Sequence, residues 1–352
     1  MDQIKQTPEN KEMDFSKMDT SPSQYKVPVS TRIGLAFIII ALSSIAALTD
    51  GHLVAVACAM LGAAALSFAR IYCESRAFVL ALLPALAFSV YPSLNILSLC
   101  VLAYLLICSL VLSQAVRKKQ SKTQSVLYVS LALAVSVIAT VALYFIINYG
   151  TDALPAFQEV YRVFFDELKK AFVLGAEEMK AVIIEQGVYS ESYDYLFSEA
   201  YAEDMIRAIK NVLLASICVL TMALAYTCVS TFSILTKHFR ATVLPSQYAI
   251  TVKLPTAIIY IICIVLLLFA GADSIFFYAS QNLLILFSPA LLIIGIREYV
   301  AQMRTHRRIP FSLIFYVFAF FISPTLPIYF MIFSGISATF TRWQMSRPQP
   351  KD

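Results

Sequence analysis

The chain alternates between long apolar blocks and short polar segments, and one internal polar stretch, residues 150–210, is far longer than the others. Most blocks approach the roughly 20 residues that a helix needs to cross a bilayer. Lipid offers exposed backbone groups no hydrogen-bond partner, so blocks of this kind predict helices. We therefore predict an all-α, polytopic transmembrane bundle of nine or ten membrane segments. The apolar blocks lie at 33–49, 53–69, 77–91, 94–113, 125–149, 211–235, 255–270, 275–296 and 311–341.

The last block has two interpretations because Pro324 and Pro327 interrupt it. It is either a short hairpin of two segments, 311–322 and 328–340, or one long kinked helix. Twelve residues of helix rise only about 18 Å, which is less than the roughly 30 Å of a hydrocarbon core. We favour the hairpin, and hence ten segments, because it puts the basic C-terminus on the same side as the other basic segments.

The amino-acid composition excludes a soluble protein. Apolar residues make up 59% of the chain and charged residues 14%, against about 45–50% and 25% in soluble domains. The net charge of +5 sits mainly in short loops. It therefore reports membrane topology, and nucleic acid is not expected as a partner.

The basic loops fix the orientation, because cytoplasmic loops carry an excess of Lys and Arg. Basic segments at 70–76, 117–122, 237–253 and 297–308 alternate with turns that lack Lys and Arg. We expect a bacterial plasma-membrane protein in which the basic loops face a cytoplasmic partner, through Arg117, Lys118, Lys119, Arg304, Arg307 and Arg308. The predicted parts are a disordered cytoplasmic tail (1–30), five membrane helices (31–149), an acidic extracytoplasmic helical insert (150–210), a second membrane block (211–342) and a cytoplasmic tail (343–352).

The acidic insert carries twelve acidic and six basic side chains and is predicted to be helical. Gly187 suits the position just beyond a helix C-terminus, and Ser192 is a candidate N-cap of a second helix, which can continue into the next span. The first helix is predicted because apolar residues recur at intervals of three and four. They are Phe157, Tyr161, Phe164, Leu168, Phe172, Gly175, Met179 and Ile183.

That apolar stripe suits a lid or a protein-contact surface, packing against a partner helix included, or a helix that lies on lipid. We favour the first reading, because a helix lying on anionic lipid would have a basic polar face and this one is acidic. Four tyrosines of the insert, including Tyr193, could line a binding surface. Tyrosines also favour the membrane–water boundary in the absence of any ligand.

Sequence signals for catalysis are missing from the chain. It has no phosphate-binding loop, no dinucleotide-binding glycine motif, no nucleophile elbow and no metal-ligand pair. We expect no enzymatic activity, no cofactor and no metal. No acidic or basic side chain lies in the middle of a predicted span, which disfavours a proton-coupled pump. Polar candidates for solute contact remain near the outer ends of the spans: Asp273, Gln281, Asn282 and Asn148. Pro84 and Pro289 interrupt helices and free backbone carbonyls.

Several short motifs in the second half resemble the YybS-like family of bacterial membrane proteins. Leu244-Pro245 followed by Lys253-Leu254-Pro255 is similar to its cytoplasmic loop. Gln281-Asn282-Leu283-Leu284, then Ser288-Pro289 and Gly295, resemble its penultimate helix. Gly335-Ile336 ahead of Phe340-Thr341-Arg342-Trp343 resembles its C-terminal end. This chain has Ser337-Ala338-Thr339 where the family tends to carry an aspartate, and it lacks a tryptophan before Pro255, so no role of those residues is carried over.

The resemblance implies a fold relationship to the substrate-binding membrane subunits of energy-coupling factor transporters and to a rod-shape membrane protein. Two functions follow as hypotheses. The chain could bind or transport a small molecule, with the basic loops docking an energising module and the small residues at 55–59 and 62–65 as a candidate docking patch. Alternatively, it is a scaffold of a cell-envelope or division complex, with the acidic insert as the contact surface.

Overall fold

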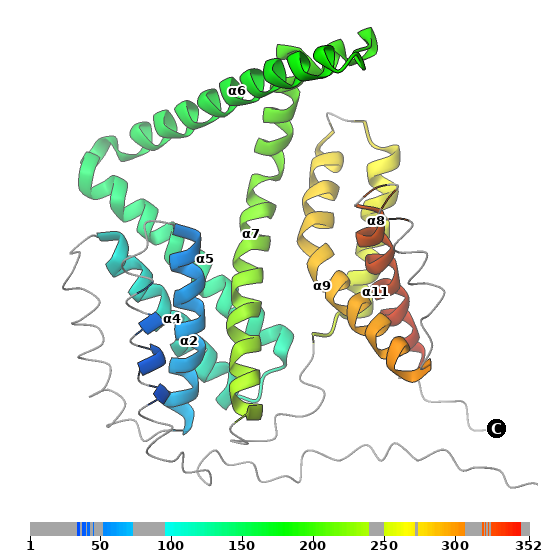
Figure 1. Cartoon of the computed structure of the whole chain (residues 1–352). Coiled ribbons are helices and arrows are strands. Elements are labelled where there is room, and N and C mark those ends of the chain that lie inside the picture. The colour runs from blue at the N-terminus through cyan, green and yellow to red at the C-terminus, as the bar shows by residue number, and fades with distance from the viewer. Residues whose placement is uncertain are drawn as a thin grey trace, which may run out of the picture. The chain divides into compact units, whose positions relative to one another are not determined.

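The structure, a computed structural model, describes residues 52–72, 96–238, 250–271, 274–306, 323 and 325–345, together with single positions between 34 and 45 and at 319 and 321. In these residues all regular structure is helical (Figure 1). The elements are α2 (His52–Tyr72), α4 (Ile96–Arg117), α5 (Lys122–Tyr149), η3 (Gly150–Asp152), α6 (Ala153–Glu185), η4 (Glu191–Phe197), α7 (Glu199–His238), α8 (Leu254–Phe269), α9 (Ile275–His306) and α11 (Leu326–Met345).

Four helical stretches in the described residues are long and apolar enough to cross a membrane. They are Val54–Tyr72, Lys122–Glu185, Glu199–His238 and Ile275–Ala301, and Ala103–Arg117 and Leu254–Phe269 are shorter apolar helices. The all-α, polytopic membrane architecture predicted from the apolar blocks is therefore confirmed. The predicted blocks at 33–49, 77–91 and 311–322 lie wholly or mostly outside the described residues.

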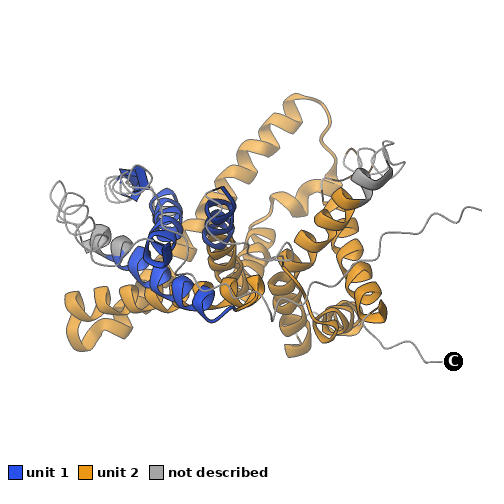
Figure 2. Ribbon diagram, turned by 90° about the horizontal axis from the view of Figure 1, so that it is seen from below, with its two compact units in different colours: residues 1–119, 227–249 blue, residues 120–226, 250–352 orange. Residues whose placement is uncertain are grey.

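The chain forms two compact units, which do not follow the order of the sequence (Figure 2). Unit 1 contains residues 1–119 and 227–249, and unit 2 contains residues 120–226 and 250–352. In the described part of the chain, unit 1 therefore holds α2, α4 and the end of α7. Unit 2 holds α5, α6, most of α7, and α8, α9 and α11.

In unit 1, α2 and α4 pack side by side and run parallel. A Cβ atom on Gly62 would lie 2.7 Å from Leu105 Cδ1, and further along both helices Ser67 Oγ donates to the Ser109 carbonyl at 3.2 Å. Near the C-terminal ends, an Arg117 Nη donates to the Arg70 carbonyl at 3.3 Å. Because each later residue of α2 contacts a later residue of α4, the two helices are parallel. The predicted topology requires this of two spans that are separated by one other crossing.

In unit 2, α8, α9 and α11 form a packed group. Pro255 occupies the first turn of α8, where its missing N–H costs no helical hydrogen bond. Tyr260 of α8 contacts Ser288 of α9, and Cys263, further along α8, contacts Ser280, which comes earlier in α9. The two helices are therefore antiparallel. Leu291 and Ile294 of α9 are almost completely buried. A shared apolar core joins the three helices: Ala257, Tyr260, Leu291, Ile332 and Ile336.

The course of α11 bears on the two interpretations of the last apolar block. The helix begins at Leu326, after a turn in which the Leu326 N–H donates to the Ser323 carbonyl at 3.1 Å. It runs parallel to α9, because Leu291 lies against Gly335 and Glu298 pairs with Arg342 further along. One continuous helix through the prolines would run antiparallel to α9. α11 thus has the direction expected of the second segment of the hairpin, and the first segment, 311–322, lies mostly outside the described residues.

All four basic segments predicted as loops are partly helical, since α2 extends to Tyr72 and α7 to His238 as well. Arg297 and Arg304 belong to α9, which continues to His306, and Arg117 is the last residue of α4. Lys122 is the first residue of α5 rather than a loop residue. Ser121 and Gln124 form a capping box at that point, in which each side chain accepts a hydrogen bond from the other residue's backbone N–H. Such a box satisfies N–H groups that the first helical turn leaves without partners.

The insert is a long helix, α6, followed by a return segment. Gly150 has a φ of +56° at the bend between α5 and α6. Gly187 has a φ of +69° and closes α6 as predicted: its N–H donates to the Ile184 carbonyl and that of Val188 to the Ile183 carbonyl. These two bonds form a Schellman motif.

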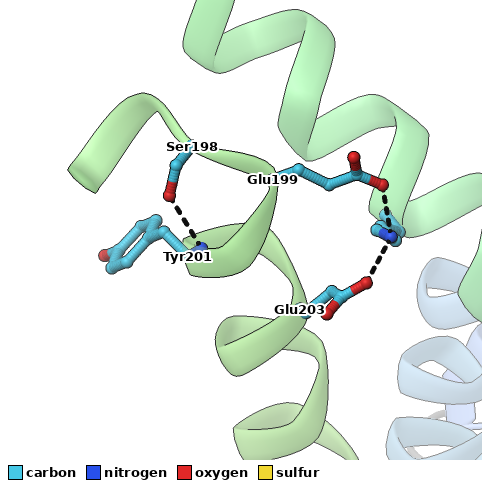
Figure 3. Close-up of polar contacts among 5 residues, drawn as sticks. Ser198, Glu199, Tyr201 and Glu203 are labelled. Atoms are coloured by element: carbon cyan, nitrogen blue, oxygen red, sulfur yellow. Dashed lines mark hydrogen bonds and ion pairs between the residues drawn. The ribbon is translucent and has the colours of Figure 1, made fainter. Parts of the chain in front are cut away.

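The prediction that Ser192 caps the second helix is wrong. Residues 191–197 form the 3₁₀ segment η4, and α7 begins at Glu199. Ser198 Oγ accepts from the Tyr201 N–H at 3.2 Å and is the cap (Figure 3). A β-region backbone at the cap position suits this role. α7 then continues without a break for 40 residues, so the second helix of the insert does continue into the next span.

Candidate functional site

The strongest candidate site lies where Pro289 interrupts the hydrogen-bonding pattern inside α9. Proline has no N–H, so the carbonyl four residues earlier, that of Ile285, loses its helical donor. One residue before the proline, Ser288 Oγ donates to the Leu284 carbonyl at 2.5 Å. α9 changes direction along its course (Figure 1), as expected of a helix with an internal proline.

A tyrosine of α8 completes this polar group. The hydroxyl of Tyr260 lies 3.0 Å from Ser288 Oγ, and the Tyr260 residue is only 4% exposed. One turn away, the Cys263 thiol is hydrogen-bonded to Ser280 of α9, and both residues are buried. We call Tyr260, Cys263, Ser280 and Ser288 the α8–α9 polar cluster.

The cluster carries no formal charge. From Leu254 to Ile296 the sequence holds one acidic or basic residue, Asp273, at the turn between the helices. Hydroxyl groups both donate and accept, so the cluster can hydrogen-bond a neutral polar molecule or a water. It offers neither an ionised partner for a charged solute nor a nucleophile activated by a base. In the described residues, no three His, Cys, Asp or Glu side chains gather as metal ligands.

The residues predicted for solute contact are placed separately. Asn282 Nδ2 donates to the Tyr278 carbonyl of its own helix at 2.8 Å and to the Asn211 carbonyl of α7 at 2.9 Å. Asn148 Nδ2 donates to the Tyr144 carbonyl at 2.7 Å, within α5. Gln281 is half-buried on α9, and Tyr193 is exposed in η4. Asp273 lies outside the described residues. Asn282 thus joins two helices.

The basic residues predicted to face a partner are only partly described. Lys118 and Lys119 lie exposed in the turn after α4. Arg304 belongs to the last turn of α9, and Arg307 and Arg308 lie outside the described residues. The small-residue docking patch is already packed inside the chain: Ala59, Ala63 and Ala64 are fully buried. That patch offers a partner little surface.

A second polar region joins α6 to the start of α7, outside the membrane-spanning segments. Lys169 Nζ donates to Glu199 Oε1 at 2.7 Å and to Glu203 Oε1 at 2.8 Å (Figure 3). The hydrogen bond from Lys169 lowers the pKa of Glu199, and the same bond raises the pKa of Lys169.

Further along α6, Lys180 Nζ donates to Asp194 Oδ1 at 2.9 Å, and the Tyr189 hydroxyl donates to the same oxygen. The hydrogen bonds from Tyr189 and Lys180 lower the pKa of Asp194. These contacts are largely exposed and fasten α6 to η4 and to the start of α7. We therefore assign them a structural role.

Sequence reasoning missed the α8–α9 polar cluster. The sequence indicates a freed carbonyl near Pro289 but not the side chains that lie beside it. A signal was present: Tyr260 is the single tyrosine of the block at 255–270, and Ser288 directly precedes the proline. What the sequence could not show is which turn of α8 faces which turn of α9.

These helices define a polytopic, all-α membrane protein with a helical insert. The chain belongs to the family described as Predicted membrane protein (DUF2232), whose model matches residues 36–336. The match runs through both membrane blocks and the acidic insert between them. No curated protein and no solved structure matches the chain.

Proposed function

We propose that the chain is a non-enzymatic membrane protein that binds a small molecule, or takes part in its transport, and that the α8–α9 polar cluster contacts the solute. The observation that carries this proposal is the pair formed by Tyr260 and Ser288 beside Pro289. Polar groups buried among apolar helices mark binding sites when a helix break supplies a further free carbonyl. A neutral solute with hydrogen-bonding groups fits the uncharged cluster.

The setting of the site follows from the charge pattern. The Lys and Arg distribution favours a bacterial plasma-membrane protein with its N-terminus in the cytoplasm and the acidic insert outside. The solute would enter near that insert. The basic ends of α4 and α9 would dock an energising module, which the resemblance to the YybS-like family implies through its fold relationship to energy-coupling factor subunits.

A thermal-shift screen of the purified full chain against vitamins and small metabolites tests the proposal. A ligand at about one hundred times its Kd should stabilise the protein by about 2.7 kcal/mol. We expect that shift to be lost in Ser288→Ala and in Tyr260→Phe. Ser130→Ala is the matched control, because it removes another interhelical hydroxyl contact, to Thr221. A screen without any stabilising solute, or a shift retained in both cluster variants, would contradict the proposal.

A second function is supported by a different surface. The C-terminal half of α6 leaves Leu174, Met179 and Val182 exposed, and Tyr193 and Tyr195 of η4 are exposed beside it. This favours a scaffold in a cell-envelope or division complex, with that surface as the protein contact. A photo-reactive amino acid at position 193 in living cells should then capture one reproducible partner. The same amount of product from a probe at Asp152, at the other end of the insert, would count against a specific partner.

A further inference from the structure

α6 exposes apolar side chains along its whole length, but its two halves have different surroundings. In the N-terminal half, Leu154 is 65% exposed and Phe164 is 59% exposed. Phe157, Val160 and Tyr161 are exposed on the same side. The spacing of three and four residues places these five on one face of the helix. We call them the α6 N-terminal face.

The start of this face is fixed at the end of α5. The ring of Phe157 meets that of Phe145 in α5 edge-on, with centroids 5.5 Å apart, and Phe145 stacks on Tyr149 at 5.7 Å. The apolar part of α5 ends at Tyr149, just before Gly150. The α6 N-terminal face therefore begins at the height where α5 leaves the apolar layer.

The end of this face is fixed against α7. Lys210 Nζ lies 4.8 Å from the centroid of the Phe165 ring, and the apolar part of α7 begins immediately after Lys210. A lysine at this place extends its amine from the apolar boundary toward the headgroups. Both ends of the segment 154–165 are thus tied to the membrane boundary, by two different helices.

The C-terminal half of α6 lies further out. Lys169 binds Glu199 and Glu203, which precede Lys210 by 11 and 7 residues of α7. At 1.5 Å per residue, these contacts stand about 10–16 Å beyond Lys210. The headgroup region is only about 5–8 Å thick on each side. Met179, although 60% exposed, is therefore beyond the reach of lipid.

Charge supports the same division. Glu159 and Arg162 are the only charged residues between Ala153 and Phe165, and they pair with each other at 2.7 Å. Apart from Asp152, the acidic excess of the insert begins at Asp166. The objection that an acidic helix avoids anionic lipid therefore does not apply to the N-terminal half.

We propose that the α6 N-terminal face lies in the headgroup layer of the membrane that α5 and α7 cross, with lipid as its partner. Its composition suits this layer, because Tyr places an amphipathic ring at the boundary and Phe and Leu are typical of the apolar face of an interfacial helix. Amphipathic helices lie at a depth of about 5–10 Å in this region. The insert is then held at the lipid surface by the first half of α6 and projects from it with the second.

The test uses the single tryptophan of the chain, Trp343. In a Trp343→Phe background, one tryptophan is introduced at Phe164, and separate variants carry it at Val160, Met179 or Asp166. Each full-length variant is reconstituted into phosphatidylcholine vesicles with and without lipid brominated near the headgroup. Acrylamide quenching from the water is measured in parallel.

We expect brominated lipid to reduce the emission of Phe164→Trp and Val160→Trp by about two-fold, and acrylamide to quench them weakly. Met179→Trp and Asp166→Trp should show the reverse. The two N-terminal variants check each other if one of them fails to fold. Quenching of both by acrylamide alone would overturn the proposal. Protection of both from acrylamide and from brominated lipid would overturn it too, because protein would then cover the face.

Discussion

Two pairs of parallel helices, α2 with α4 and α9 with α11, show how differently a glycine can serve the same kind of contact. In the α2–α4 pair, Gly62 faces the end of a side chain, Leu105 Cδ1. In the α9–α11 pair, Gly295 faces the Met331 carbonyl and Gly335 faces the Leu291 carbonyl. The first contact is between a backbone and a side chain, and the second is between two backbones.

The difference lies in what can move. A leucine side chain can change rotamer to make room, whereas a backbone carbonyl inside a helix can move only with the helix. Membrane helices associate through close packing of small residues, because lipid provides no hydrophobic drive between them. The tight α9–α11 crossing should therefore tolerate substitution far less than the α2–α4 crossing.

The largest effect is expected from Gly335→Ala and Gly295→Ala. The new Cβ would overlap the facing carbonyl oxygen and lie 2.9 Å and 2.8 Å, respectively, from the carbonyl carbons of Leu291 and Met331. We expect a destabilisation of about 3 kcal/mol, measured by thermal unfolding in detergent. Gly175→Ala is the control, since its Cβ would meet nothing within 4 Å, and it should gain up to about 1 kcal/mol from helix propensity. If Gly335→Ala were as stable as the native chain, the close backbone contact between α9 and α11 at this glycine would be excluded.

A smaller effect is expected from Gly62→Ala, at about 1 kcal/mol. Its Cβ would lie 2.7 Å from Leu105 Cδ1, and that side chain can rotate away. Combining Gly62→Ala with Leu105→Ala should cost less stability than the sum of the single changes, because the shortened side chain leaves room for the methyl group. No such rescue should exist for Gly335→Ala. Additive effects at positions 62 and 105 would remove the contrast between the two pairs.

The ion pair at the end of the α9–α11 crossing should matter less. Arg342 Nη2 lies 3.3 Å from Glu298 Oε2, and both side chains are a little over one-third exposed. Exposed pairs contribute about 0–1 kcal/mol, so Arg342→Gln should lower stability by about 0.5 kcal/mol. The loss should shrink in high salt, because salt screens exposed charges. A loss as large as that of Gly335→Ala would mean that the pair, and not the glycines, holds the crossing.

The smallest effect is expected at the α6–α7 contact, which differs from both helix pairs in depending on pH. The lowered pKa values of Glu199 and Asp194 mean that their contribution is present above their unfolded values near 4 and lost as pH falls through the lowered values. The raised pKa of Lys169 means that its contribution is lost only above about 10. The contact should therefore be constant from about pH 5 to 9.

Spin labels at Met179 and Ala208 would report this contact as a distance. We expect a broader distribution at about pH 3 than at pH 7, and Lys169→Met at pH 7 should resemble the acidic sample. The helix pairs in the membrane should stay unchanged over the same range. A distribution that broadens between pH 5 and 7 would point to other groups.

The sequence predicted those features that depend on short-range patterns. Apolar blocks located the helices, and Gly187 marked the end of α6, because a positive φ strongly favours glycine. It failed where the outcome depends on tertiary contact. The small residues at 62–65 predicted a docking patch, yet the backbones touch at Gly295 and Gly335, two isolated glycines. Nothing local in the sequence shows that they lie on facing turns.

The candidate site shows the same limit. Asn282 was chosen because a polar residue near a span end could meet a solute, but it joins α9 to α7. Tyr260 and Ser288 come from two helices, and only the antiparallel packing of α8 on α9 brings their hydroxyls together. The exposure of the α6 stripe was equally hidden, because periodicity shows that a helix has an apolar face and not what covers it.

Three helices of unit 2 have a mechanical consequence. The Ser130–Thr221 contact at 3.1 Å and the Lys122 amine over the Tyr226 ring join α5 to α7. α6 follows α5 after the bend at Gly150 and binds α7 through Lys169, and Figure 1 shows it crossing from the end of α5 to the start of α7. Three helices that are joined to one another at three places form a triangle, and a triangle keeps its shape even when each joint can bend. Without the Lys169 contacts, α6, which is about 50 Å long, would be held by the bend at Gly150, by the Phe165–Lys210 contact and by residues 186–198. The exposed ion pairs of Lys169 thus limit how far the middle of α6 can move away from the start of α7.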